Sequence, residues 1–519
     1  MLVAVLAQQV QFLNNNINEL IPSLAWYFFM VLMLKYMGMK KDYILPNIKE
    51  ARRRNNTEEI ARLTYNVDEK YLNLGKDKKY LIKTHGCQAN FRDSETIAGL
   101  LEELGFTETT SEEDADIVLI NTCAIREGAE DKVFGEVGAL KRLKRERPEM
   151  LIGICGCMAQ EEKTVTTLLE KYHQVDIIFG THNIVSLPKM IYDIYNANKK
   201  RAVEVFSKQG EVIENVPVTR LSSHKASVNI MYGCDKFCTY CIVPYTRGKE
   251  RSRLLEDVVK EVQELKDTGY KEVCLLGQNV NAYGKDLKLG YDFATLLTEV
   301  AKTGINRVRF MTSHPWDFND DMIMAIKNNK NICPYIHLPV QSGSNSILKK
   351  MNRRYTIEDY KNLFDRLTSN LDNFAYTTDI IVGFPNETDE DFKATLDIVD
   401  YCKYDNAFTF IYSPRSGTPA AVMEDETPRA VKEARLQELN KKVAYYANMK
   451  NQKYLNQVVE VLVDGTSKKN DAVYSGYTRE NKLVNFKADD VQIGDLVNVR
   501  ITECMSFSLN GEFVGKVVE

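Results

Sequence analysis

The stretch GCDKFCTYC, residues 233–241, places three cysteines within eight positions: Cys234, Cys238 and Cys241. Thiolates at this spacing suit a soft metal site, either zinc or an iron–sulfur cluster. A structural zinc site usually has a fourth Cys or His nearby, and the next thirty residues contain none. A 4Fe–4S cluster held by three cysteines keeps one iron open to a small molecule. The loop therefore favours an open iron–sulfur site, with zinc as the alternative.

The cysteine loop follows the first of six strand-like segments that alternate with helical segments. The six segments are SVNIMYGC (227–234), EVCLLGQN (272–279), RVRFMTSHP (307–315), YIHLPVQSG (335–343), YTTDIIVGFP (376–385) and FTFIYSPRSG (408–417). Alternation of this kind predicts a parallel sheet. Six units predict a partial (β/α)6 TIM-type barrel over residues 215–450. Each segment ends in polar or glycine residues, where such a barrel has its active site.

A second alternation of strands and helices precedes the first, over residues 78–197, and predicts a flavodoxin-like parallel sheet. Three of its strands end at a cysteine, namely Cys87, Cys123 and Cys157. Ligands of such sheets gather at the carboxyl ends of the strands. We therefore expect these three thiols to converge, although unrelated core cysteines are the alternative, since free Cys is often buried as a small apolar residue.

The two ends of the chain differ from the middle. Residues 1–38 form an apolar extension whose run of 14 residues (21–34) is shorter than the roughly 20 that a membrane span needs. We interpret it as a mis-assigned start, with a surface-associated or disordered extension as the alternative. Residues 39–77 are expected to be a helical lead-in. Short, closely spaced strands over 451–519 predict a small all-β barrel.

Composition limits the class of protein. A hydrophobic content of 44% and a charged content of 27% are typical of a globular protein without a membrane part. The odd number of cysteines, eleven in a long chain, argues against a secreted disulfide framework and favours the cytoplasm. The net charge of −4 means that any contact with nucleic acid depends on local basic clusters.

The motifs resemble those of the methylthiotransferase family of radical S-adenosylmethionine (SAM) enzymes. The matching stretches are THGCQANFRDSE, NTCAIRE, GCMAQ and the loop 233–241. The resemblance implies two 4Fe–4S clusters, with Cys234, Cys238 and Cys241 holding the one that binds and cleaves SAM. Cys87, Cys123 and Cys157 would hold an auxiliary cluster that carries a sulfur. Cys155 competes with Cys157, but the family pattern places the ligand directly before MAQ.

The resemblance also implies a radical mechanism, for which we assign no side-chain acid or base. One SAM would methylate the sulfur on the auxiliary cluster, and a second would be cleaved to a radical that removes hydrogen from an unreactive C–H. The two cluster sites are thus the expected catalytic centres. An electron donor such as flavodoxin or ferredoxin, and a carrier of sulfur or clusters, would be partners.

Further motifs, covering about residues 80–519, resemble the branch of the family that modifies prenylated tRNA. They include YCIVPYTRGKERSR, LLGQNVNAYG, FMTSHP, HLPVQSGS, MNRRYT and YSPRSGTPAA. The implied reaction adds methylthio to N(6)-dimethylallyladenosine at position 37, next to the anticodon. Two alternatives are threonylcarbamoyl-adenosine in tRNA and an aspartate of a ribosomal protein. A zinc-bearing RNA-binding protein is the alternative of a different class.

Four residues at strand ends are candidates for contacts with SAM: Gln278, Asn279, Ser313 and Gly383. Gly383 would let the adenine approach the backbone closely, because glycine has no Cβ. His314 and His337 are as consistent with a structural role as with an active-site role.

Contacts with RNA are expected from the basic stretch RGKERSR and from the end barrel, which resembles a TRAM domain. The candidates are Arg247, Arg251 and Arg253, whose guanidinium groups could bind phosphates. Tyr477 could stack on an unpaired base, as could Tyr474 and Phe486, although core packing is the alternative for these aromatics.

Overall fold

The computed structural model describes residues 60–517, apart from 125–128, 198, 206–209 and 468–469. The predicted extension 1–38 lies outside these residues. The predicted helical lead-in is wrong for residues 60–77, which form strand β1 (Arg62–Thr64) and a 3-10 turn, η1 (Glu69–Tyr71). The backbone is extended here because β1 pairs in parallel with β8 (Val212–Glu214). No helix within the described ranges is long and apolar enough to cross a bilayer.

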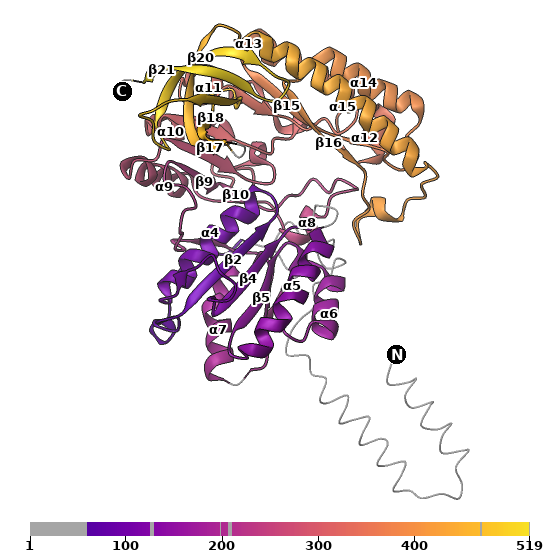
Figure 1. Cartoon of the computed structure of the whole chain (residues 1–519). Coiled ribbons are helices and arrows are strands. Elements are labelled where there is room, and N and C mark those ends of the chain that lie inside the picture. The colour runs from indigo at the N-terminus through magenta and orange to yellow at the C-terminus, as the bar shows by residue number, and fades with distance from the viewer. Residues whose placement is uncertain (1–59, 125–128, 198, 206–209, 468–469, 518–519) are drawn as a thin grey trace, which may run out of the picture. The chain divides into compact units, whose positions relative to one another are not determined.

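The first sheet consists of six parallel strands in the order β3-β2-β4-β5-β6-β7. Figure 1 labels its strands β2, β4 and β5. They are β2 (Lys79–His85), β3 (Thr107–Glu108), β4 (Ile117–Thr122), β5 (Leu151–Gly156), β6 (Ile177–Phe179) and β7 (Ala202–Glu204). The chain adds β3 on one side of β2 and β4 on the other, so the strand order reverses between β2 and β4. This is the flavodoxin-like arrangement, whose ligands bind at the reversal point.

Helices cover both faces of this sheet, because its strands are apolar on both sides. On one face α4 (Gln88–Glu103) and α7 (Leu187–Asn196) pack on a core that includes Ile117 and Leu119. On the other face α5 (Ala129–Glu146) and α6 (Glu162–Lys171) pack on a core that includes Val118 and Ile120. Two 3-10 turns complete this region: η2 (Met158–Gln160) and η3 (Ile184–Ser186).

The middle of the chain contains the six predicted parallel strands. They are β9 (Lys225–Asn229), β12 (Glu272–Leu276), β13 (Arg307–Phe310), β14 (Tyr335–His337), β15 (Ala375–Val382) and β16 (Asn406–Ile411). They form two three-stranded sheets, β9-β12-β13 and β14-β15-β16, which a bridge between Val308 and Ile332 joins. Within the described residues no ladder joins β16 to β9. The result is the open partial barrel that the sequence predicts.

One large apolar core lies between these strands and the helices that connect them. The helices are α9 (Leu255–Asp267), α10 (Phe293–Lys302), α11 (Asp320–Asn328), α12 (Asn345–Lys350), α13 (Ile357–Asn370), α14 (Asp389–Cys402) and α15 (Arg429–Gln452). The starts of α13 and α14 are fixed by reciprocal capping boxes, Thr356 with Asp359 and Thr388 with Asp391. Shorter elements are β10 (Met231–Tyr232), α8 (Val243–Thr246), β11 (Arg251–Ser252), η4 (Val280–Ala282), η5 (Pro315–Asp317) and η6 (Pro419–Val422).

The last strands close into a small barrel in the order β17-β18-β19-β21-β20, as predicted. They are β17 (Val458–Ser467), β18 (Asn470–Tyr477), β19 (Leu483–Lys487), β20 (Leu496–Cys504) and β21 (Leu509–Lys516). The barrel has its own apolar core, in which Val461, Val484 and Ile501 are fully buried.

Candidate functional site

The three strand-end cysteines meet at the carboxyl edge of the first sheet. Cys87 begins α4 after β2, Cys123 follows β4 and Cys157 follows β5. The thiol of Cys123 is hydrogen-bonded to the thiols of both Cys87 and Cys157. The β2–β4 reversal point lies between two of these strands. We call these three residues the auxiliary triad.

A buried asparagine network fixes the start of α4 beside the auxiliary triad. The side-chain oxygen of Asn90 accepts from the backbone N–H of Cys87 at 3.3 Å. The side-chain amide of Asn121 donates to the carbonyl of Asn90 at 2.8 Å and to Ser94 Oγ at 2.9 Å. Gly156 has a positive φ of 92°, and a Cβ there would lie 2.4 Å from Asn121 Oδ1. The motifs GCQAN and GCM thus contain residues that position the thiols as well as the thiols themselves.

The auxiliary triad favours thiolates. The hydrogen bond to Cys123 is the largest cause that lowers the pKa of Cys87 to about 5 and that of Cys157 to about 7, and Arg247 lowers both further. The same hydrogen bonds raise the pKa of Cys123, which keeps the proton. Arg247 is held in place by Asp93 of α4, with Nη2 2.6 Å from Oδ2. Metals bind thiolates, so the thiolate character of Cys87 and Cys157 suits metal ligands.

Cys155 lies apart from the auxiliary triad. It is paired within the sheet, between Asn121 of β4 and Phe179 of β6, and its Sγ is 3.7 Å from the carbonyl of Ile120. Burial raises the pKa of its thiol well above the ordinary value. Cys155 is thus a core residue here, which supports the choice of Cys157.

The second triad, Cys234, Cys238 and Cys241, lies in the loop between β10 and α8, and we call it the loop triad. Gly233, with φ of 72°, allows the loop to start tightly, because a Cβ there would lie 2.1 Å from the carbonyl oxygen of Lys249. Burial raises the pKa of Cys234 well above its usual range and that of Cys241 to about 12. Without a metal these two thiols keep their protons at neutral pH.

The two triads lie close to each other. Cys157 of the auxiliary triad packs in a small apolar cluster with Ala124, Ile242 and Tyr245, against which Phe237 also packs. Phe237 belongs to the loop triad's own segment, and Ile242 directly follows Cys241. The hydroxyl of Thr181 donates to the carbonyl of Thr246 at 2.6 Å and ties the two regions together.

A buried carboxylate connects the loop triad's segment to one of the predicted SAM contacts, Asn279. Lys236 of the loop lies 2.6 Å from Asp317, and the amide of Asn279 donates to Asp317 at 2.8 Å. Burial opposes ionisation of Asp317, but hydrogen bonds from Lys236, Lys285 and Asn279 outweigh it and hold its pKa at about 2. Asp317 was not identified from the sequence, because nothing in its neighbourhood marks it as more than a surface acid.

Two of the predicted SAM contacts have buried polar atoms without a partner. Asn279 Oδ1 and Ser313 Oγ are buried and find no hydrogen-bond partner in the described structure. Buried polar groups are rarely left unpaired unless a water or ligand satisfies them. Both residues follow strands at the carboxyl end of the barrel, as does the partly buried Gln278. These residues fit a polar ligand in this place.

Packing of the backbone explains the glycine at position 383 without any contact to SAM. Its φ is 66°, and a Cβ would lie 2.5 Å from the side chain of Lys432 of α15. Its N–H donates to Glu387 at 2.8 Å, so this group is already engaged. The predicted approach of an adenine to Gly383 stays a prediction.

The two histidines have structural partners. The ring of His314 accepts from the N–H of Trp316 at 3.3 Å, and burial together with Arg353 lowers its pKa to about 2. His337 lies within the barrel, 3.0 Å from the hydroxyl of Thr377. His314 is therefore neutral at physiological pH.

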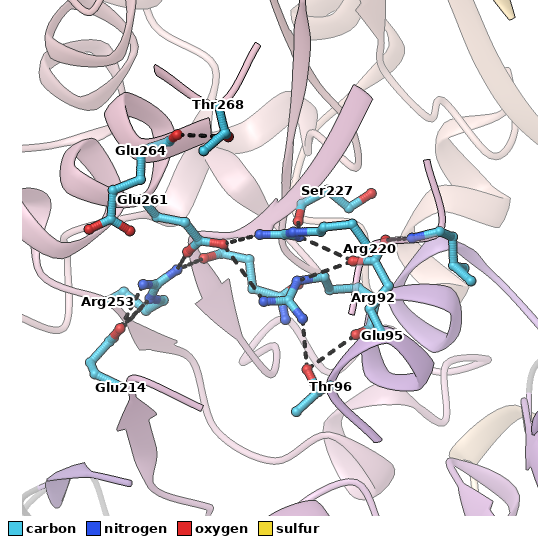
Figure 2. Close-up of polar contacts among 12 residues, drawn as sticks. Arg92, Glu95, Thr96, Glu214, Arg220, Ser227, Arg253, Glu261, Glu264 and Thr268 are labelled. Carbon is cyan, nitrogen blue, oxygen red and sulfur yellow. Dashed lines mark hydrogen bonds and ion pairs between the residues drawn. The ribbon is translucent and has the colours of Figure 1, made fainter. Parts of the chain in front are cut away.

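The predicted RNA-binding arginines are buried and engaged with other groups. Figure 2 shows Arg253 between Glu214 and Glu261, with shortest distances of 2.6 and 2.5 Å. Arg247 pairs with Asp93, and Arg251 donates to the carbonyls of Arg247 and Lys249 at 3.3 and 2.9 Å.

Two further arginines, Arg92 and Arg220, complete the cluster in Figure 2 around Glu261. Burial opposes ionisation of Glu261, but the three guanidinium groups hold its pKa at about 2. This cluster lines a cavity of about 410 Å³ between α4 and α9. Binding of RNA by Arg247, Arg251 and Arg253 stays a prediction, and their present contacts give them a structural role.

The aromatics of the end barrel mostly serve its core. Phe486 is 2% exposed and stacks on Tyr474, with ring centroids 6.1 Å apart. Tyr477 is partly buried, and its carbonyl accepts from Arg307 of β13 at 2.8 Å. Its stacking on a base stays a prediction. The exposed Phe507, 59% accessible, was not identified from the sequence.

Neither triad forms a preassembled site for a single metal ion. Among the described residues, no three His, Cys, Asp or Glu side chains are placed to hold one ion. Tetrahedral zinc needs its ligands around one centre. A four-iron cluster, in contrast, binds each thiolate at a different corner, so the thiols can stand farther apart. The donor set, three thiols in each place, fits such a cluster.

Three regions of the chain match known families. Residues 79–180 match the uncharacterized protein family UPF0004, residues 228–399 the radical SAM superfamily and residues 452–514 the TRAM domain. Among solved structures, a radical S-adenosylmethionine methyltransferase from Kitasatospora setae has a TM-score of 0.48 and 14% identity, covering 66% of this chain and 77% of that chain.

Two curated relatives cover almost the whole chain. A tRNA-2-methylthio-N(6)-dimethylallyladenosine synthase of Staphylococcus saprophyticus is 56% identical over 473 residues, 91% of this chain and 92% of the relative. The protein of that name from Staphylococcus aureus is 56% identical over 476 residues, 92% of each chain. The chain therefore belongs to the tRNA-2-methylthio-N(6)-dimethylallyladenosine synthase family of radical SAM proteins.

Proposed function

We propose that this enzyme replaces the C2 hydrogen of N(6)-dimethylallyladenosine at position 37 of tRNA with a methylthio group. Family membership implies a 4Fe–4S cluster and SAM, and the names of the relatives state the tRNA substrate. We propose further that the chain holds two such clusters, one on the loop triad and one on the auxiliary triad. A one-electron donor such as flavodoxin or ferredoxin, and a carrier of sulfur or clusters, would serve it.

One observation carries the proposal: Cys157 of the auxiliary triad shares an apolar cluster with Ile242 and Phe237, which are neighbours of the loop triad in sequence. Radical formation and sulfur transfer must occur close to the same substrate carbon. The reason is that the primary carbon radical formed from SAM reacts with the nearest available C–H bond. The cluster of Cys157, Ala124, Ile242 and Tyr245 supports this, because it packs the segment of the loop triad against Cys157.

The bound groups would supply the redox chemistry, which is SAM cleavage at the loop triad and delivery of sulfur from the auxiliary triad. Each product would consume two SAM molecules, one sulfur atom from the carrier and electrons from the donor. It would release S-adenosylhomocysteine, methionine and 5'-deoxyadenosine, which takes the abstracted hydrogen. The protein's own residues would bind SAM and orient it relative to the cysteine loop. Asn279 and Ser313 offer unpaired polar atoms to SAM, and Asp317 fixes Lys236 of the loop relative to Asn279.

The test uses anaerobically reconstituted protein with SAM, a reductant and tRNA with or without the prenyl group. The RNA is digested, and nucleosides and 5'-deoxyadenosine are measured by mass spectrometry. We expect the methylthio nucleoside from prenylated tRNA alone. Cleavage of SAM without methylthio product on either tRNA would indicate another substrate, either threonylcarbamoyl-adenosine in tRNA or a ribosomal-protein aspartate. No SAM cleavage by protein that contains its clusters would contradict the enzyme proposal.

A further inference from the structure

Arg353, in the stretch MNRRYT between α12 and α13, lies against the loop triad. It is 5% exposed, and its Nη1 lies 3.6 Å from Cys238 Sγ. Its Nη2 donates to the carbonyl of Pro339 at 2.8 Å, and its Nε donates to the hydroxyl of Tyr355 at 3.1 Å. The guanidinium also lies over the Tyr355 ring, 5.2 Å from the centroid. These contacts fix its orientation toward the sulfur.

The residues that precede Arg353 hold the cysteine loop independently of its charge. The hydroxyl of Thr239 donates to the carbonyl of Lys350 at 2.8 Å, and its N–H donates to the carbonyl of Met351 at 3.0 Å. The side chain of Asn352 donates to the carbonyl of Phe237 at 3.1 Å. The position of the loop therefore has its own anchors, so the charge of Arg353 needs a separate explanation.

Among the described residues, no carboxylate lies within ion-pair distance of Arg353, and its contacts are a sulfur, a carbonyl and a phenol. The arginines in Figure 2 show the usual solution, since Arg253 and Arg220 each contact two carboxylates. Burying an unpaired charge is costly. The compensating negative charge is thus to be sought at Cys238.

We propose that Arg353 is a positioning residue that donates a charge-assisted hydrogen bond to the Cys238 thiolate and thereby raises the reduction potential of the loop-triad cluster. The inference rests on the proposed function, which assigns a cluster to this triad. On reduction the cluster accepts one electron from the external donor and becomes more negative by one charge. A fixed cation beside a ligand sulfur stabilises the reduced form more than the oxidised form, and hydrogen bonds to cluster sulfurs act in the same direction.

The test measures the midpoint potential by a redox titration followed by electron paramagnetic resonance. The full-length chain carries Cys87→Ala, Cys123→Ala and Cys157→Ala, so that only the loop triad can hold a cluster. In this background we compare Arg353→Gln, which keeps donors but loses charge, with Arg353→Lys, which keeps charge. Arg354→Gln is the matched control, because Arg354 is the exposed neighbour.

Arg353→Gln is expected to make reduction at least tenfold less favourable, which is a shift of about 59 mV to lower potential for a one-electron couple. Arg353→Lys should recover most of this shift, and Arg354→Gln should cause none. An unchanged potential in Arg353→Gln, with full iron content, overturns the inference. If Arg353→Gln holds no cluster, the Arg353→Lys variant decides the question. An Arg353→Lys variant that keeps the cluster and its potential supports the inference. An Arg353→Lys variant that loses both overturns it. Absence of iron from the background chain overturns the ligand assignment, and the inference with it.

Discussion

The auxiliary triad and the loop triad contain the same three side chains but are built in opposite ways. The loop triad comes from eight consecutive residues, and burial raises the pKa of Cys234 and Cys241. The auxiliary triad comes from three strand ends spread over 71 positions, 87 to 157, and mutual hydrogen bonds lower the pKa of two of its thiols.

The difference also concerns the neighbouring cation. Arg247, beside the auxiliary triad, already has Asp93 as partner, whereas Arg353, beside the loop triad, has no carboxylate among the described residues. At the auxiliary triad the thiolates are stabilised mainly by hydrogen bonds to Cys123, and Arg247 adds a smaller contribution. A site with an uncompensated cation favours the more negative state of a bound cluster. The predictions below test this contrast in order of expected size.

The largest effect should separate the reactions of the two triads. Cys238→Ala is expected to abolish both 5'-deoxyadenosine formation and the methylthio nucleoside, because no cluster remains to cleave SAM. Cys123→Ala should abolish only the nucleoside and retain SAM cleavage. Mass spectrometry of both products from the same reaction checks this. Loss of SAM cleavage in Cys123→Ala, with loop-triad iron retained, would show that the two sites are not independent.

Removing the cation of the auxiliary triad should destabilise the protein. Arg247→Ala leaves Asp93 buried without its partner and is expected to cost about 3–5 kcal/mol of unfolding free energy. Denaturant unfolding of the apo-protein measures this cost. The double variant Arg247→Leu with Asp93→Leu removes both charges and should regain most of it. Equal losses in both variants would mean that packing, and not the ion pair, is responsible.

Uptake of iron should depend on pH more steeply at the loop triad. Cluster assembly must remove protons from Cys234 and Cys241 at the loop triad, whose pKa values lie above the usual range. At the auxiliary triad it must remove one from Cys123, because Cys87 (pKa about 5) and Cys157 (pKa about 7) are already mostly ionised above pH 8. Acidification from pH 9 to 8 thus opposes assembly at the loop triad more. Per pH unit, the logarithm of iron affinity should fall by about one more there, for one additional proton released. The iron affinity of chains that keep only one triad is measured in competition with a chelator at several pH values. This gives the pH dependence of affinity for each triad. Equal dependences would contradict the proposed electrostatic difference between the triads.

The smallest effect is expected at Cys155. Cys155→Ala removes one buried sulfur and should cost about 1 kcal/mol of stability. It should leave iron content and product formation unchanged, because the thiol contacts the carbonyl of Ile120 and packs in the core that also contains residues of α4 and α7. If the variant loses iron, Cys155 replaces Cys157 as the ligand, and Cys157→Ala should then be silent.

The sequence predicted local features well because they have a period or a fixed spacing. Strand and helix alternation predicted both parallel sheets, and the rule on carboxyl ends of strands predicted that Cys87, Cys123 and Cys157 converge. The helical lead-in was wrong for residues 60–77, since pairing with β8, 150 positions later at Val212, overrides local preference.

Residues whose roles depend on distant partners were missed or interpreted differently. Arg253 lies in a basic stretch, which favours RNA, but Glu214 and Glu261 approach it from other elements. Likewise, Asp317 lies in no motif, and the motif MNRRYT assigns Arg353 no role, because only folding brings these two residues to the cysteine loop. Charge compensation in three dimensions is not visible in a linear pattern.

The most direct test of the account is the iron and sulfide content of three anaerobically reconstituted chains. They are the wild type, a chain with alanine at all three loop-triad positions and a chain with alanine at all three auxiliary positions. We expect about eight iron atoms in the wild type and about four in each variant, with a 4Fe–4S spectrum in both, because each triad would hold one cluster alone. A wild type with about four, or an auxiliary variant that retains about eight, would contradict the assignment of one cluster to each triad.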